Sequence, residues 1–278
     1  MNDLPLLRST SQLRSRIRSW RAFGETVALA PLSWPLHEGQ LAVVRSARAE
    51  ADRALAALSG WDGDPTWDEA RAAQLLDESG ADALYLPSRE ALVPERAVVQ
   101  IAVPGLTDVL EGADDPSAFA GFALSSVRLF SQAQADVAVY SELDWQSLAI
   151  MRRVVRDLDL PTEVRAVPAE RDDDGIAWSA GAQGLSDSDR PAARRLWREL
   201  TRAAQAIAAG ADPDATLDDA ADALADAGAE VEYLELRDAE TLEELSAPGA
   251  RPARIFCAIA LGGTRLIDTV AVSGDDPL

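Results

Sequence analysis

A histidine and a glycine stand where a predicted strand gives way to a predicted helix. The apolar run 27–30 is followed by a proline-containing break, and a helical pattern resumes at Glu38. His37 is the only histidine of the chain, and Gly39 follows two residues later. Backbone N–H groups at a helix start are free and carry partial positive charge, so this connection is suited to binding phosphate. A purely structural interpretation, in which His37 only caps or packs the turn, stays open because the motif is weak.

The elements that must position this connection alternate between strands and helices. Strands are predicted where short apolar runs lie between turn residues, and helices where apolar residues recur every three or four positions. Such alternation predicts an α/β fold with a doubly wound parallel sheet, whose ligands bind at the carboxyl ends of the strands. The predicted strands of this half cover 27–30, 83–87, 98–103, 137–140 and 162–167, and the predicted helices cover 38–58, 67–79, 116–135 and 144–158.

A polar run at 170–175 marks a predicted domain boundary, because the pattern of elements changes after it. We therefore expect a Rossmann-like nucleotide-binding-type domain over 1–176 and a small α+β domain over 177–278. Gly262 and Gly263 lie between two β-like runs, which is a strong hairpin signal. The second domain is predicted to hold helices at 186–210 and 216–228 and antiparallel strands at 230–237, 254–261 and 265–272.

Composition limits the classes of partner and of chemistry. The 278 residues carry a net charge of −21, which argues against a nucleic-acid backbone or an anionic membrane as partner. All 26 basic residues are arginines, so no mechanism that requires a lysine amine can operate. Cys257 is the only cysteine, which excludes an internal disulfide and a cysteine-based metal site. No apolar run approaches a membrane span and no secretory signal is recognised, so a cytoplasmic location is expected.

The chain resembles the pantothenate synthetase (pantoate–β-alanine ligase) family in several segments that occur in the family's order. His37 and Gly39 match that family's H-x-G motif, and Pro31 matches the proline before it. The resemblance implies a Rossmann-like domain of the adenylating nucleotidyltransferase superfamily, a small C-terminal lid domain and a homodimer. The other matching segments are VPGLTDVLEG (103–112), YSELDWQSLAIMRRVVRDLDLP (140–161), DGIAWS (174–179), YLELRDAETLEEL (233–245) and ALGGTRLID (260–268).

The resemblance also assigns roles residue by residue. The family forms an acyl-adenylate from pantoate and ATP, and the amine of β-alanine then attacks it. Gln40 stands at the position of a second catalytic histidine and Leu143 at that of a catalytic lysine, so His37 is the remnant of the catalytic set. The predicted nucleotide-binding residues are His37, Gly39, Asp144 and Ser179, the predicted substrate-binding residues are Gln146 and Ser147, and no metal ligand is predicted.

These replacements lead to the expectation of a pseudoenzyme. Ala180, Gly181 and Ala182 stand where the family has Ser-Arg-Asn, and losing one transition-state donor or cation costs roughly 2.7–4 kcal/mol. A member degenerate for pantoate–β-alanine ligation, bound to an active paralogue or another protein, is therefore our first expectation. A repurposed ATP-dependent amide ligase for another carboxylate is the first alternative, and a weak genuine pantoate–β-alanine ligase is the second. No cofactor is assigned with certainty from the sequence, and ATP and Mg²⁺ are expected if nucleotide activity is retained.

Overall fold

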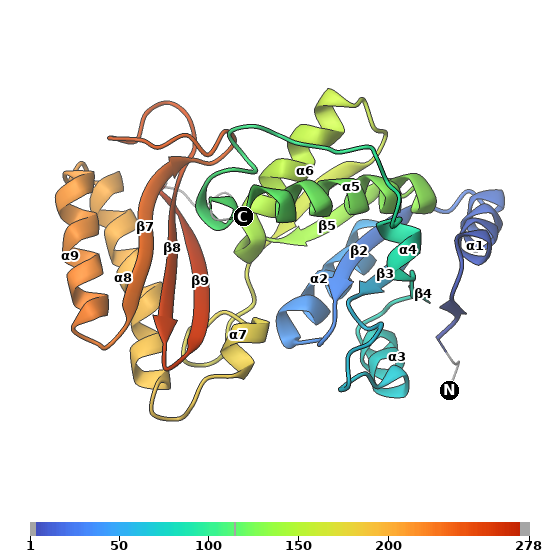
Figure 1. The fold of residues 1–278 in the computed structure, drawn as a ribbon, viewed down its shortest axis with the longest axis horizontal. Helices are drawn as coiled ribbons and strands as arrows, with labels where there is room; N and C mark the ends of the chain where they lie inside the picture. Colours follow the sequence, from blue (N-terminus) through green and yellow to red (C-terminus); the bar gives the residue numbers. More distant parts are fainter. Residues whose placement is uncertain (1–3, 114, 273–278) are drawn as a thin grey trace. The chain divides into compact units, whose positions relative to one another are not determined.

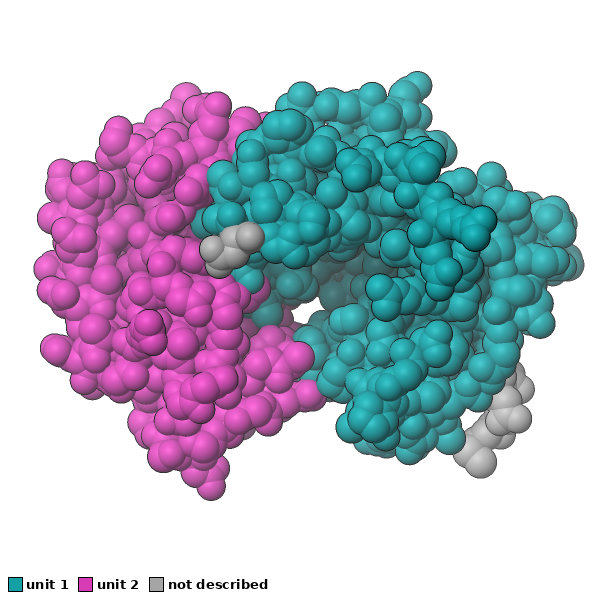
Figure 2. All heavy atoms as spheres, in the orientation of Figure 1, with its two compact units in different colours: residues 1–167 teal, residues 168–278 magenta. Residues whose placement is uncertain are grey.

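The chain divides into two compact units, Met1–Val167 and Pro168–Leu278, which Figure 2 shows in separate colours. A computed structural model describes residues 4–113 and 115–272. The units divide after residue 167, whereas the sequence places the boundary after residue 176, so the polar run 170–175 belongs to the second unit.

The first unit is built on a six-stranded sheet in the order β1-β4-β3-β2-β5-β6 (Figure 1). Every neighbouring pair is parallel, which confirms the predicted α/β class. The central strands are continuous apolar runs because helices cover both faces of such a sheet. The strands are β1 (Leu6–Leu7), β2 (Val27–Ser33), β3 (Arg53–Ser59), β4 (Ala83–Tyr85), β5 (Val137–Ser141) and β6 (Glu163–Val167).

Several helices of the first unit begin at polar residues whose side chains cap the first turn. Ser9 caps α1 by accepting a hydrogen bond from the backbone N–H of Gln12, and Asp68 caps α3 in the same way through Arg71. Within the described residues, no helix is both long and apolar enough to cross a bilayer. The helices are α1 (Thr10–Ala22), α2 (Glu38–Glu50), α3 (Glu69–Glu78), α4 (Arg89–Leu92), α5 (Pro116–Ala133) and α6 (Trp145–Asp157), with 3₁₀ turns η1 (Leu110–Gly112) and η2 (Glu142–Asp144).

Two predictions of secondary structure are wrong. The predicted helix 38–58 ends at Glu50, and its last third is β3, because the chain turns extended at Ala51 and the run 54–58 is buried within the sheet. Alanine and leucine fit either structure, so periodicity could not separate them. The predicted strand 98–103 is an irregular segment, in which Val98 is 92% exposed and with which no strand of the described residues pairs.

The second unit pairs an antiparallel three-stranded sheet with helices, as the sequence predicts. Gly262 and Gly263 both have positive φ, at 56° and 86°, which the tight hairpin between β8 and β9 requires. Apolar residues of α8 and α9 pack on the sheet to form this unit's core. The elements are α7 (Ala180–Gln183), α8 (Arg190–Ala208), α9 (Pro213–Ala225), β7 (Glu230–Asp238), β8 (Ala253–Leu261) and β9 (Thr264–Val272).

Candidate functional site at the carboxyl edge of the parallel sheet

The parallel sheet has a topological switch point between β2 and β5. From β2 the chain proceeds through β3 and β4 to one side, and from β5 it proceeds to β6 on the other. Open α/β sheets bind ligands in the crevice outside the carboxyl ends of the two strands at such a point. The connection after β2 leads to α2 and holds His37, and the connection after β5 leads through η2 to α6 and holds Asp144. The structure therefore brings these two predicted segments to the same edge of the sheet.

His37 occupies the N-cap position of α2 in an extended conformation, with φ of −138°. Its side chain makes no capping bond, and its Nδ1 atom is buried without a hydrogen-bond partner. Burial lowers the pKa of His37 below its ordinary value, so the imidazole is neutral at neutral pH. The N-cap side chain therefore accepts no hydrogen bond from the first N–H groups of α2. Helix starts bind anions through N–H groups of this kind.

Gln40 lies in the first turn of α2 and is anchored to the end of β2. Its Nε2 donates to the backbone oxygen of Ser33 at 2.9 Å and to the Ser33 Oγ at 3.2 Å. Its Oε1 is buried without a partner, so the free end of the amide is an acceptor. The neighbouring Gly39 is buried in the same turn. Gln40 thus presents an uncharged oxygen at the position where the resemblance places a histidine.

Leu143 is a buried residue of η2 and brings no charge to the switch point. Its side chain is 9% exposed, and its backbone N–H donates to the Oγ of Ser141 at 3.2 Å. The apolar replacement at the lysine position is therefore accommodated in the core of the unit. Any positive charge that faces a bound phosphate must come from another group.

Asp144 is exposed and ends the η2 turn without a capping bond from its side chain. The loss of hydration among surrounding protein atoms, together with the negative charge of Glu111, raises its pKa to about 6. Because the side chain keeps contact with solvent, the energy that follows from this shift is smaller than for a buried carboxyl. Glu111 was not predicted as a site residue, since only the fold brings it near Asp144.

Gln146 holds the segment between Leu106 and Glu111 against α6. Its Nε2 donates to the backbone oxygens of Leu106 at 2.8 Å and Val109 at 2.7 Å, and its Oε1 accepts from the N–H of Glu111 at 3.2 Å. Because both amide protons and one acceptor site are used by main chain, Gln146 acts as a positioning residue in this structure. Ser147, the other predicted substrate-binding residue, is half-buried on α6.

Three tryptophans pack together beside the ends of β2 and β3. The ring of Trp67 lies 5.0 Å from that of Trp34 in an edge-to-face arrangement and 5.5 Å from that of Trp61. The Nε1 of Trp34 donates to Thr66 at 3.0 Å, and the Nε1 of Trp61 is buried without a partner. All three rings pack against the core of the first unit. The cluster therefore attaches the segment that follows β3 to this core. Trp67 was not predicted to belong to this cluster, because in the sequence it is the first residue of a predicted helix.

Ser179 lies in the second unit, where it caps α7. Its Oγ accepts from the N–H of Ala182 at 3.0 Å, and a Cβ at Gly181 would lie 2.4 Å from the backbone oxygen of Arg265. The short helix therefore packs directly on β9. The part of Ser179 in nucleotide binding stays a prediction, because its local contacts are those of a cap.

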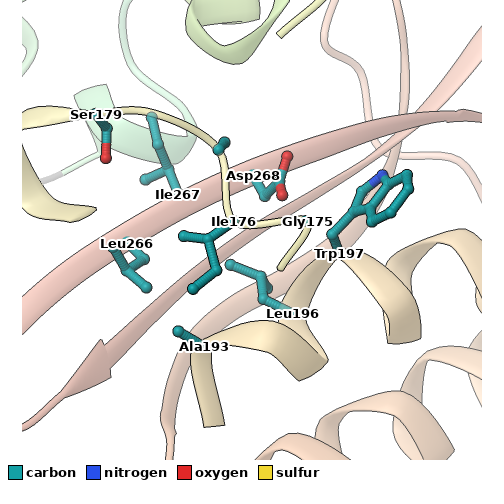
Figure 3. A pocket seen from close by; sticks show the side chains of 10 residues that line it. Gly175, Ile176, Ser179, Ala193, Leu196, Trp197, Leu266, Ile267 and Asp268 are labelled. Atoms are coloured by element: carbon teal, nitrogen blue, oxygen red, sulfur yellow. The ribbon is translucent and has the colours of Figure 1, made fainter. Parts of the chain in front are cut away.

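The turn before Ser179 is fixed by a largely buried ion pair. Arg171 reaches both carboxylate oxygens of Asp268 at 2.7 Å, and its guanidinium carbon lies 4.9 Å from the centre of the Trp197 ring. Figure 3 shows Asp268 and Trp197 beside Gly175, where a Cβ would lie 2.7 Å from the indole. The bidentate geometry makes the turn a rigid support for the segment that leads to Ser179.

Comparison with known proteins shows which family this architecture belongs to. Residues 66–271 match the model of the family described as pantoate-beta-alanine ligase. The chain belongs to the pantoate–β-alanine ligase family. Pantothenate synthetase from Paracoccus denitrificans is 42% identical over 98% of this chain and 99% of its own length. The crystal structure of pantothenate synthetase from Thermus thermophilus is 32% identical, covers 97% of this chain and 100% of its own, and has a TM-score of 0.86.

A more distant ligase of the family shares the fold. The pantoate-beta-alanine ligase from Francisella tularensis, solved with beta-gamma ATP and beta-alanine, is 20% identical. It covers 97% of this chain and 98% of its own, with a TM-score of 0.76. This likeness establishes the architecture alone.

The expectation of a degenerate family member is wrong. Similarity to relatives named pantothenate synthetase runs over nearly the full length of both proteins at 34–42% identity, and the chain retains both units of the family's fold. The expectation inferred lost activity from the number of replaced side chains, and the effects of residues that act as a unit are so strongly non-additive that such a number does not measure the remaining rate. The backbone N–H donors at the helix start, which the sequence also predicts, do not depend on side-chain identity and are retained.

Proposed function

We propose that this protein is a pantoate–β-alanine ligase that consumes ATP. The observation that carries the proposal is the switch point between β2 and β5, where the two motif segments meet in a chain that resembles relatives named pantothenate synthetase over nearly its full length. In this reaction a carboxylate oxygen of pantoate attacks the α-phosphorus of ATP and pyrophosphate leaves. The nitrogen of β-alanine then attacks the acyl carbon, AMP leaves, and the nitrogen loses a proton to give the amide.

The phosphates are proposed to lie at the start of α2. The N–H groups after His37 supply donors that need no charged side chain, and the neutral imidazole of His37 adds one hydrogen bond. Gln40 offers an acceptor, which suits a ligand hydroxyl better than a phosphate oxygen. Asp144 is ionised above about pH 6 and accepts hydrogen bonds from ligand donors at the other side of the switch point. Ser147 and the three tryptophans are proposed to contact the acid.

Magnesium is proposed to enter with the nucleotide. The described residues contain no group of three or more His, Cys, Asp or Glu side chains that could hold a metal ion. The residues present therefore do not fit a resident metal, and no step is assigned to one. Cytoplasmic location stays an expectation from the sequence.

The proposal is tested by following pyrophosphate release and pantothenate formation with purified protein, ATP, Mg²⁺, pantoate and β-alanine. Pyrophosphate release that depends on pantoate, and an amide product that depends on β-alanine, are expected. We expect His37→Ala to lower kcat/KM by about 10²-fold, as for loss of one well-placed donor. Asp77→Asn, at an exposed position of α3, is the matched control and should leave the rate unchanged.

A panel of other carboxylates replaces pantoate in the same assay. Release of pyrophosphate with another acid, and none with pantoate, would show that the ligase acts on a different substrate. No release with any acid, from protein that is folded by circular dichroism, would overturn the proposal.

A further inference from the structure

Helix α8 of the second unit borders a groove of about 620 Å³. Side chains of two adjacent rows of the helix line this groove, with members four residues apart in each row. Arg194, Arg198 and Arg202 form the first row, and Trp197 and Thr201 lie in the second. Pockets for small molecules have volumes of about 300–1,000 Å³, so this groove has room for one.

Trp197 gives the groove a rigid aromatic surface. Its ring is held in place, because the guanidinium carbon of Arg171 lies 4.9 Å from the ring centre and a Cβ at Gly175 would lie 2.7 Å from the indole (Figure 3). The residue nevertheless stays 41% exposed, whereas the preceding Leu196 is buried in the core of this unit. An aromatic side chain that is fixed and open to solvent is a platform on which a planar ring can stack.

The arginines beside this ring keep hydrogen-bond donors for a ligand. Arg194 pairs with Asp174 at 2.7 Å. Arg202 at 2.8 Å and Arg198 at 3.7 Å share the carboxylate of Glu199. A guanidinium has five N–H donors, so one carboxylate leaves several of them available. Because two guanidinium groups share one carboxylate, this part of the groove keeps a positive charge.

The hydroxyl of Thr201 lines the groove and has no partner. Its Oγ1 atom is buried and forms no hydrogen bond with any of the described residues. Thr201 lies one helical turn beyond Trp197 and three residues after Arg198, so it belongs to the same face of α8. A buried polar atom without a partner costs free energy, which a hydrogen bond to a ligand oxygen would recover.

The two ends of the groove carry opposite charges. Asp174 pairs with Arg194, so Asp173 and Asp174 lie at the end of the groove where α8 begins. Arg198 and Arg202 follow one and two turns further along the helix, about 12 Å of rise from Arg194 to Arg202. A matching ligand has a hydrogen-bond donor at one end, a planar ring and an anionic group at the other end. The net charge of −21 disfavours a long polyanion, so the ligand is small.

We propose that this groove binds a nucleoside phosphate. The base stacks on Trp197, and its amino group donates to Asp173. The phosphate accepts hydrogen bonds from Arg198, Arg202 and the hydroxyl of Thr201, because guanidinium groups match the geometry of phosphate oxygens. The inference does not rest on the ligase activity, since all these residues belong to the second unit and none lies at the carboxyl edge of the parallel sheet.

The experiment follows the indole N–H signals of the full ¹⁵N-labelled chain by NMR while AMP is added. The chain has seven tryptophans, and the signal that is missing from Trp197→Phe identifies Trp197. A saturable shift of this signal is expected. It should persist in His37→Ala, because binding at the start of α2 is a separate event that the signals of the tryptophan cluster beside β2 and β3 report.

Two substitutions test the phosphate contacts. Arg198→Ala and Arg202→Ala should each raise the dissociation constant of AMP about tenfold, as for loss of one hydrogen bond to a charged group. Arg195→Ala is the matched control, because Arg195 is an exposed arginine of the same helix that does not line the groove. It should leave the dissociation constant unchanged. Unshifted signals of the other tryptophans show that each variant is folded.

Adenosine and inorganic phosphate separate the two halves of the ligand. Each offers only one of them, so each should bind at least about tenfold more weakly than AMP. Equal binding of phosphate alone or of adenosine alone would overturn the assignment of a nucleoside phosphate. A Trp197 signal that does not move with AMP up to about 10 mM, or equal losses in Arg195→Ala and Arg198→Ala, would overturn the site itself. A shift of the Trp197 signal in a protein that releases no pyrophosphate would leave this site in place and remove only the proposed ligase function.

Discussion

Gln40 and Leu143 show how differently two replacements in one site are tolerated. The amide of Gln40 is held by Ser33 and still presents a polar atom, whereas Leu143 joins the apolar core and presents nothing to a ligand. Near them, Asp144 acquires a raised pKa, chiefly because the surrounding protein removes hydration and further because the negative charge of Glu111 disfavours its own. The chemistry of this site thus depends on neighbours more than on the identity of any single residue.

The raised pKa of Asp144 predicts a defined pH dependence of stability. The ordinary pKa is 3.8 and the folded value is about 6, so the folded state holds the proton more tightly than the unfolded state. Wild-type stability is therefore lost as the pH rises from about 4 to about 6, and stays at the lower level above that range. We expect Asp144→Asn to be more stable than wild type by about 1 kcal/mol at pH 7, after allowance for solvent screening, and equally stable below pH 4.

Urea unfolding at several pH values, followed by tryptophan fluorescence, measures this difference. Glu111→Gln should reduce it, because one of the two causes is removed. Asp77→Asn, on the exposed face of α3, should show no such pH dependence. A constant difference between Asp144→Asn and wild type at every pH would contradict the assigned pKa.

At the scale of elements, the connections matter more than the strands and helices they join. The segment between Leu106 and Glu111 has little regular structure, yet three hydrogen bonds from the single side chain of Gln146 attach it to α6. This attachment places Glu111 near Asp144. One buried amide therefore links the shape of a loop to the electrostatics of the site.

Replacing that amide should loosen the first unit. We expect Gln146→Leu to lower the free energy of unfolding by about 2–4 kcal/mol, because buried backbone oxygens lose their donors. Ser147→Ala, one residue further along α6, should change it by no more than about 0.5 kcal/mol. Denaturant unfolding monitored by circular dichroism compares them. Unchanged stability with a higher KM for pantoate would instead support the original prediction that Gln146 binds substrate.

At the scale of the whole molecule, charge is the dominant feature. A net charge of −21 makes the folded chain repel itself, and many of the arginines are engaged in local ion pairs such as that of Arg171 with Asp268. Self-repulsion of this kind is long-ranged and is therefore sensitive to dissolved salt.

Added salt, which screens the repulsion between the negative charges, should therefore stabilise the fold. We expect the Tm of the wild-type protein to rise by roughly 2–4 °C between low and moderate NaCl, which corresponds to about 1 kcal/mol. Calorimetry in NaCl and in KCl should give the same rise at equal ionic strength. A Tm that falls or stays constant with salt would show that local ion pairs outweigh the net repulsion.

Most of the architecture could be predicted from local patterns in the sequence. Strands 27–30, 137–140 and 162–167 and the hairpin at Gly262 were predicted because short apolar runs and turn residues need no distant information. The family and the position of His37 at a helix start also follow from the sequence. The alanine-rich run 54–58 was taken for helix and 98–103 for strand, since in both cases the outcome depends on whether a neighbouring strand is present.

The identity of the family and the order of its elements were therefore contained in the chain itself, because both rest on residues close together in sequence. Folding alone decided that Glu111 lies near enough to Asp144 to raise its pKa, that Gln146 hydrogen-bonds to backbone groups, and that Trp34, Trp61 and Trp67 form one cluster. Each of these depends on contacts between segments far apart in the chain, and the energy of a polar or aromatic group is set by the partners that such contacts supply.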